Sequence, residues 1–281
     1  MDIRIPLLAL LRNRRTTDPR RPEQSSSSTV WRSAAGACAL LCTALVPVSA
    51  QWLNYPTPGI PRTADGKPNL TAPAPKTPDG KPDLSGIWLR NGNYLQNLAK
   101  DGVEVPFQPW AEALYKQRME NLSKGTPGER CLPRGVPAEM TTPNPFKLVQ
   151  IPGLVLLVFE QFSYFRQILT DGRGHPTDRM PTWFGYSVGK WVGDSLVADT
   201  VGFNDQTWLD YDGHPHSDAL HTIERFRRLD FGHMEFQITI DDPKAYTKPW
   251  TVTIPFDLLP DTELIESICE NERDVPHMVG K

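Results

Sequence analysis

Residues 186–201 read YSVGKWVGDSLVADTV, and this stretch predicts a β-hairpin. Two short runs rich in apolar residues, 186–191 and 195–201, flank Gly193 and Asp194, a pair typical of the tight turn between neighbouring antiparallel strands. Similar runs continue on both sides of the hairpin, at residues 146–151, 154–160, 164–170, 219–229, 233–241, 250–258 and 263–269. Short turns containing Gly, Pro or Asp join most of these runs, which leaves no room for the crossover helices of a parallel sheet.

We therefore predict a mainly β fold for residues 86–281, built as an antiparallel meander. So many sequential strands must hide the two edges of their sheet, and a closed or nearly closed barrel does this. A sandwich of two sheets is the alternative. One amphipathic helix is predicted as an insert at 108–124, and Gly125 ends it.

The segment before the barrel, residues 51–85, is a proline-rich arm. Eight prolines fall between Pro56 and Pro82, and the sequence Asp-Gly-Lys-Pro occurs twice, at 65–68 and 79–82. Asp-Gly marks a tight turn in each copy, and two copies are too few for a repeat domain. We interpret the arm as an extended strap with two turns that packs on the barrel. A calcium- or sugar-binding turn is the alternative, although the ligand pattern of an EF-hand is absent.

The first fifty residues indicate export. Residues 33–50 are uncharged, follow Arg32 and end in Val48-Ser49-Ala50, the small-residue pattern of a signal-peptidase site. We predict a cleaved signal peptide with a long basic region at 1–50, a mature start at Gln51, a periplasmic or secreted location and no stable membrane span after cleavage. An uncleaved membrane anchor is the alternative. The chain of 281 residues has a net charge of −3, which argues against nucleic-acid binding.

Cleavage of this signal would leave two cysteines, Cys131 and Cys269. Two thiols in an oxidising compartment predict one disulfide between them, and two buried free thiols are the alternative.

Two resemblances to known proteins add to these predictions. Gly86-Ile87-Trp88, ahead of a series of hairpins, is similar to the Gly-x-Trp of the first strand in lipocalin or calycin-type barrels. Residues 186–281, with their Trp-x-Gly-Asp hairpin and their Gly-Phe-Asn-Asp, Gly-His-Pro-His and Asp-Asp-Pro-Lys-Ala-Tyr-Thr segments, resemble a widespread group of exported, uncharacterised bacterial proteins. The first resemblance implies a ligand cavity inside the barrel, and the second implies no established activity.

The densest group of polar side chains lies between residues 203 and 228. His214 and His216 point to the same face if their segment is extended, and a third histidine follows where the next strand begins. The three histidines are candidate ligands of a divalent metal ion. Metal-free proton transfer by one histidine that a carboxylate orients is a second hypothesis, and a polar loop without catalytic function is a third. The candidate catalytic residues are His214, His216, His221, Glu224, Asp210 and Asp212.

A second group of residues could line a ligand pocket. Glu160 and Arg166, beside one predicted hairpin, could form an inward-facing pair that anchors a ligand or closes the barrel end. Tryptophans could supply an aromatic lining or belong to the core. The candidate ligand-binding residues are Trp183, Trp191, Trp208, Glu160, Tyr164, Arg166 and Arg225.

Two classes of function therefore fit the sequence. The first is an exported β-barrel protein that binds a small apolar or aromatic molecule in a cavity. The second is a periplasmic lyase, isomerase or hydrolase that uses the histidine cluster, with or without a divalent metal ion. The sequence lacks the nucleophile elbow of serine hydrolases, a phosphate-binding glycine loop, a dinucleotide fingerprint and the His-Glu-x-x-His motif of metalloproteases.

Overall fold

The computed structural model describes residues 56–91, 97–99 and 102–269. The predicted signal peptide at 1–50 and the first residues of the arm, 51–55, lie outside the described residues. Within the described ranges, no helix combines the length and the apolar character that crossing a membrane requires.

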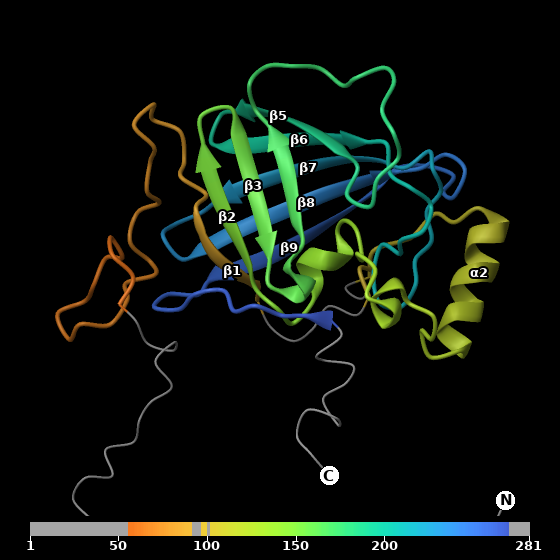
Figure 1. Cartoon of the computed structure of the whole chain (residues 1–281), viewed down its shortest axis with the longest axis horizontal. Helices are drawn as coiled ribbons and strands as arrows, with labels where there is room; N and C mark the ends of the chain where they lie inside the picture. The colour runs from red at the N-terminus through yellow and green to blue at the C-terminus, as the bar shows by residue number, and fades with distance from the viewer. Residues whose placement is uncertain (1–55, 92–96, 100–101, 270–281) are drawn as a thin grey trace, which may run out of the picture. The chain divides into compact units, whose positions relative to one another are not determined.

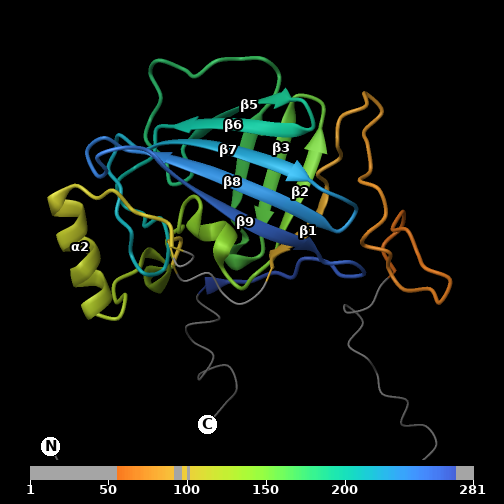
Figure 2. The same ribbon diagram turned by 180° about the vertical axis from the view of Figure 1, so that it is seen from behind.

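The fold is a closed barrel of nine strands, which confirms the predicted fold class (Figures 1 and 2). Each strand pairs with the next one along the chain, and the first also pairs with the last, so the sheet has no free edge. The strands are β1 (Gly86–Arg90), β2 (Phe146–Ile151), β3 (Leu154–Phe159), β4 (Phe165–Leu169), β5 (Tyr186–Val192), β6 (Ser195–Val201), β7 (His221–Arg228), β8 (His233–Asp241) and β9 (Trp250–Leu258). The described helices are α2 (Pro109–Glu120) and the short 3-10 turns η2 (Pro127–Arg130), η3 (Ala138–Thr141) and η4 (Gln161–Ser163).

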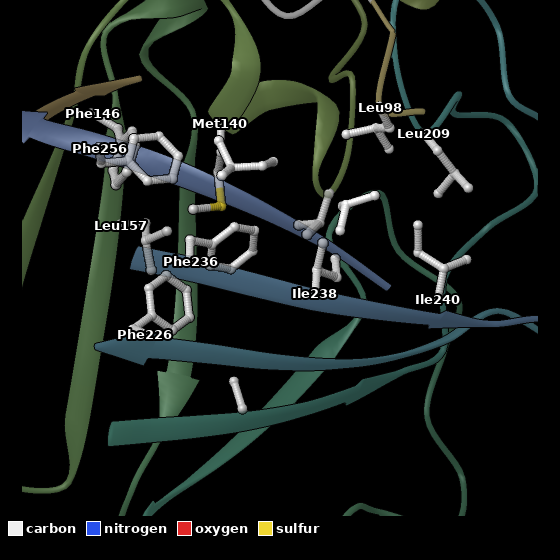
Figure 3. Packing of buried hydrophobic residues seen from close by; sticks show 14 of the residues in the cluster. Leu98, Met140, Phe146, Leu157, Leu209, Phe226, Phe236, Ile238, Ile240 and Phe256 are labelled. Carbon is white, nitrogen blue, oxygen red and sulfur yellow. The ribbon is translucent and has the colours of Figure 1, made fainter. Parts of the chain in front are cut away.

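Apolar side chains fill the middle of the barrel. Along β9 every second residue is buried, which is the periodicity of a strand with one face turned inward. Figure 3 shows how Phe226, Phe236 and Phe256 of three neighbouring strands line up near Leu157. The ring centroids of Phe226 and Phe236 are 4.8 Å apart, and those of Phe236 and Phe256 are 6.0 Å apart. These side chains occupy the space in which the lipocalin resemblance implies a ligand cavity.

One junction of the barrel departs from the predicted antiparallel meander. β4 and β5 run parallel, and their register joins only Ile168 with Ser187 and Leu169 with Val188. The segment 170–185 between them is long enough to carry the chain back along the barrel before β5 begins. The argument from short turns therefore does not apply to this connection.

The predicted strand at 263–269 is wrong, because residues 262–268 form no strand. The outer edge of β9, where another strand would pair, is already occupied by β1. The segment is held instead by the backbone N–H of Ile265, which donates to the Glu160 carboxylate at 3.1 Å, and by a disulfide between Cys131 and Cys269, whose Cα atoms are 5.5 Å apart. The structure thus confirms the predicted disulfide.

The helix α2 lies over the segments that follow β6 and β8, at one end of the barrel. The indole N–H of Trp110 donates to the carbonyl of Lys244 at 2.7 Å, and the Arg118 guanidinium donates to the carbonyl of Gly213 at 2.9 Å. The helix ends before the predicted residue 124, because Leu122 and Ser123 adopt left-handed φ angles of 53° and 56°.

The arm lies at the other end of the barrel and packs on it as a strap. Its two repeat copies form the same turn, in which the first residue donates its N–H to the fifth carbonyl, at 2.9 Å in 63–67 and 2.8 Å in 77–81. The carbonyl of Leu70 accepts from the N–H of Gly232, in the β7–β8 turn, at 2.7 Å. The side chain of Gln150 donates to the carbonyl of Pro82 at 3.2 Å.

Candidate functional site

A pocket of about 590 Å³ opens where β4 and β5 separate beyond their two paired residues. This volume lies in the range of small-molecule sites. Arg166 reaches the pocket from the buried face of β4. The aromatic side chains of its wall are Tyr164, Phe165, Trp183, Phe184 and Tyr186.

Several contacts fix this aromatic wall in place. The ring of Phe184 stacks on Phe159 at the end of β3, with centroids 5.6 Å apart and planes 10° from parallel. The Tyr164 hydroxyl donates to the carbonyl of Cys131 at 2.6 Å, beside the disulfide. Gly185, next to Phe184, has a φ of 68°, and a Cβ atom there would lie 2.7 Å from a methyl group of Thr200. Only glycine fits this turn without strain.

Arg166, which lines the pocket, belongs to an ion pair buried behind it. Arg166 donates from both terminal nitrogens to the two carboxylate oxygens of Glu224 on β7, each at 2.7 Å, and both side chains are almost fully buried. Arg166 also donates to the hydroxyls of Ser187 and Thr200, each at 2.9 Å, while Thr222 donates to Glu224 at 2.9 Å. The positive charge at the pocket is therefore compensated from within the barrel.

His214 lies in a different place, in an aromatic cage under α2. Its Nδ1 is 2.6 Å from Asp210, and its ring stacks on Tyr115 with centroids 4.3 Å apart. The other Asp210 oxygen accepts the backbone N–H groups of Gly213 at 2.9 Å and of His214 at 3.0 Å. Asp210 thus closes a tight loop, and His214 is part of the packing between this loop and the helix.

His216 and His221 have other partners. His216 is buried, with Nε2 2.6 Å from the Thr207 hydroxyl and Nδ1 3.0 Å from the Ser217 carbonyl. Burial lowers the pKa of His216 below its ordinary value, although the Ser217 carbonyl opposes the shift. His221 lies on the outer face of β7, with its Nε2 3.0 Å from Asp199 on β6.

Of the six predicted catalytic residues, the structure pairs His214 with Asp210, and the other four have separate partners. Glu224 belongs to the ion pair inside the barrel, and Asp212 accepts a hydrogen bond from the Asn97 amide at 2.8 Å. Across residues 56–91, 97–99 and 102–269, no group of three or more His, Cys, Asp or Glu side chains is arranged to hold a metal ion. The divalent-metal hypothesis therefore gains no support from the geometry.

The other predicted ligand-binding residues are scattered. Trp208 is buried beneath the Arg118 guanidinium, which lies 4.2 Å from its ring centroid. Trp191 lines a separate pocket of about 450 Å³ beside the second turn of the strap. Arg225 is half-buried in β7, opposite Gln237 of β8. Of the seven residues, Tyr164, Arg166 and Trp183 meet at one pocket.

Glu139 in η3 is a buried acid that is not among the candidate residues predicted from the sequence. One of its carboxylate oxygens accepts the backbone N–H of Arg134 at 3.0 Å, and the other has no hydrogen-bond partner among the described residues. Burial raises the pKa of Glu139 to about 7, although the hydrogen bond and the charge of Arg134 oppose the shift. The Glu139 charge also raises the pKa of Tyr164 in the pocket wall, second to burial of that tyrosine.

No protein-family model matches the chain, and no curated protein matches it significantly. The resemblances to exported bacterial proteins and to lipocalins stay predictions.

Proposed function

We propose that the protein binds a small, uncharged aromatic molecule in the pocket between β4 and β5. The observation that carries this proposal is an aromatic wall beside an arginine whose charge a buried carboxylate compensates. Aromatic rings such as those of Trp183 and Tyr186 offer large apolar contact areas to a flat ligand.

The preference for an uncharged ligand follows from the hydrogen bonds of Arg166. Its terminal nitrogens already donate to Glu224, Ser187 and Thr200. A carboxylate ligand would have to displace Glu224 and leave that buried charge uncompensated. Breaking a buried pair in this way costs about 3–5 kcal/mol, which outweighs one new ion pair with the ligand.

Export is part of the proposal. A disulfide closes a large part of the chain, and such bonds persist in oxidising compartments. Together with the signal-like residues 33–50, this supports a periplasmic or secreted protein that starts at or near Gln51. The intact mass of the protein purified from its native host tests the cleavage directly.

Catalysis by the histidine cluster is not part of the proposal. His214 and His216 have separate partners in the loops at one end of the barrel, and His221 lies outside it. The His214–Asp210 pair has the geometry of an oriented histidine, but its two side chains are only 1% and 0% exposed, so neither reaches a substrate at the protein surface.

Two dyes that share one aromatic skeleton test the binding proposal. N-phenyl-1-naphthylamine is uncharged, and 8-anilinonaphthalene-1-sulfonate carries a sulfonate. We expect saturable binding of the uncharged dye, weaker binding of the sulfonate, and a Kd about tenfold higher after Trp183→Ala, which is about 1.4 kcal/mol.

Trp110→Ala is the matched control, because Trp110 is a 45% exposed indole on α2 that does not line this pocket. It should leave the Kd of the uncharged dye unchanged. No binding of this dye, or binding that Trp183→Ala leaves intact, would refute the proposed site. Tighter binding of the sulfonate would refute the uncharged class of ligand.

A further inference from the structure

Asp199 joins two histidines from different parts of the chain. One oxygen of its carboxylate, Oδ1, lies 2.8 Å from Nε2 of His175 and 3.0 Å from Nε2 of His221. Asp199 and His221 lie on neighbouring strands, β6 and β7. His175 comes from the long segment 170–185, which links the parallel strands β4 and β5. The carboxylate therefore ties this segment to the outer face of the barrel.

The same segment continues into the wall of the ligand pocket. Its last residues include Trp183 and Phe184, and β5 begins with Tyr186. The ring of His175 lies edge-on to Tyr186, with centroids 6.1 Å apart. Near its end the segment is bonded to the barrel through Thr182, whose N–H donates to the carbonyl of Gly202 at 2.9 Å. His175 is thus a hydrogen-bonded contact between the earlier part of the segment and the sheet.

The electrostatics favour a strong contact. Burial opposes ionisation of Asp199, but the hydrogen bonds from His175 and His221 outweigh it and hold the pKa of this carboxyl below its ordinary value. Asp199 is therefore an anion at neutral pH. A charged acceptor makes shorter and stronger hydrogen bonds than a neutral one, even when both imidazoles are neutral.

Much of segment 170–185 is exposed to solvent and depends on specific bonds to stay against the barrel. Met180 is 83% exposed, and Arg173 and Arg179 are also exposed. The Arg179 guanidinium donates to the carbonyl of Pro176, within the segment itself. Exposed connections with few buried apolar contacts open easily unless specific bonds hold them.

We propose that Asp199 is a positioning residue: with His175 and His221 it forms a clasp that holds segment 170–185 against β6 and β7 and so keeps Trp183, Phe184 and Tyr186 in place as the pocket wall. This inference rests on the proposed function for its link to ligand binding. The clasp itself is a statement about the segment and has its own measurement.

Limited trypsin digestion measures the clasp without any ligand, because Arg173 and Arg179 place two cleavage sites in the segment. We expect Asp199→Ala to increase the rate of cleavage after these two arginines about tenfold, with fragments identified by mass spectrometry. The same variant should raise the Kd of N-phenyl-1-naphthylamine several-fold. Asp218→Ala is the matched control, since it removes another exposed carboxylate, which pairs with Lys244 away from the segment.

His175→Phe is a second variant that keeps an aromatic ring beside Tyr186 but cannot donate to Asp199. It should reproduce the faster cleavage, and it keeps the proposal testable if Asp199→Ala does not fold. Cleavage and dye affinity in both variants equal to those of Asp218→Ala would overturn the clasp. Faster cleavage in a protein that binds no dye even as wild type would support the clasp and refute the proposed ligand site.

Discussion

Glu139→Gln should stabilise the protein at neutral and alkaline pH. In the folded protein burial raises the pKa of Glu139 from 4.5 to about 7. The folded state therefore holds the proton that the unfolded chain releases, and above pH 7 folding carries a penalty of roughly 3 kcal/mol for this one group. Glutamine is neutral at every pH, and its side-chain oxygen can still accept the N–H of Arg134, as Glu139 does at 3.0 Å.

The direction of the Glu139 pKa shift determines the pH range over which this group changes the free energy of unfolding. The folded-state pKa lies above the unfolded value, so the stabilising contribution of the protonated acid is complete below pH 4.5 and is lost as the pH rises through about 7. Wild type and Glu139→Gln should have nearly equal free energies of unfolding near pH 4.5. The difference should grow to roughly 3 kcal/mol in favour of the variant by pH 8.

Urea denaturation of both proteins from pH 4.5 to 8, with the disulfide intact, measures this difference. All other titrating groups are common to the two proteins, so their contributions cancel. Glu120→Gln, at the exposed end of α2, is the control and should change the free energy of unfolding by less than about 0.5 kcal/mol. A difference between wild type and Glu139→Gln that is the same at pH 4.5 and pH 8 would refute the reasoning.

Two further predictions concern the stability of the barrel. Arg166→Met and Glu224→Leu should each lower the free energy of unfolding by roughly 3–5 kcal/mol, because each leaves a buried charge without a partner. The double variant leaves no such charge, so its loss should be smaller than the sum of the two single losses. Additive losses in urea denaturation would contradict this. Cys131→Ser with Cys269→Ser should lower the free energy of unfolding by about 5 kcal/mol in the same assay, because the bond spans a sequence separation of 138 residues; a loss below about 1 kcal/mol would show that the bond contributes little.

Much of the barrel could be predicted because its signals are local. Alternating burial in β9 and tight turns such as Gly193-Asp194 follow from residues that are adjacent in the sequence. The parallel junction could not be predicted in this way. The residues 171–174 read as an ordinary Asp-Gly turn, yet the chain continues to Thr182, which pairs with Phe203 beyond β6. That pairing is a tertiary contact, and the pattern of apolar and polar residues in segment 170–185 does not predict it.

The predictions for the candidate site also divide into those that local sequence supports and those that depend on tertiary contacts. The hairpin predicts that Glu160, Tyr164 and Arg166 lie together, and the structure brings Tyr164 and Arg166 to the pocket. The acid that pairs with Arg166 is Glu224, whereas Glu160 accepts the Ile265 N–H. The argument for His214 and His216 assumed an extended segment, but Asp210 accepts two backbone N–H groups and folds that segment into a tight loop. A carboxylate four residues before the histidine can therefore change the backbone on which a same-face argument rests.

The buried ion pair and the pocket have a common origin in the parallel junction. β4 and β5 share only two residue pairs, so the backbone hydrogen bonds that hold other neighbouring strands are missing along most of this seam. Arg166 bridges the seam with side-chain bonds to Ser187 on β5, and Glu224 anchors Arg166 from β7. Such a network satisfies buried polar groups on the inside of the barrel while the outside of the seam stays open. The pocket therefore lies at the one junction where the strands run parallel, which the local sequence pattern does not predict.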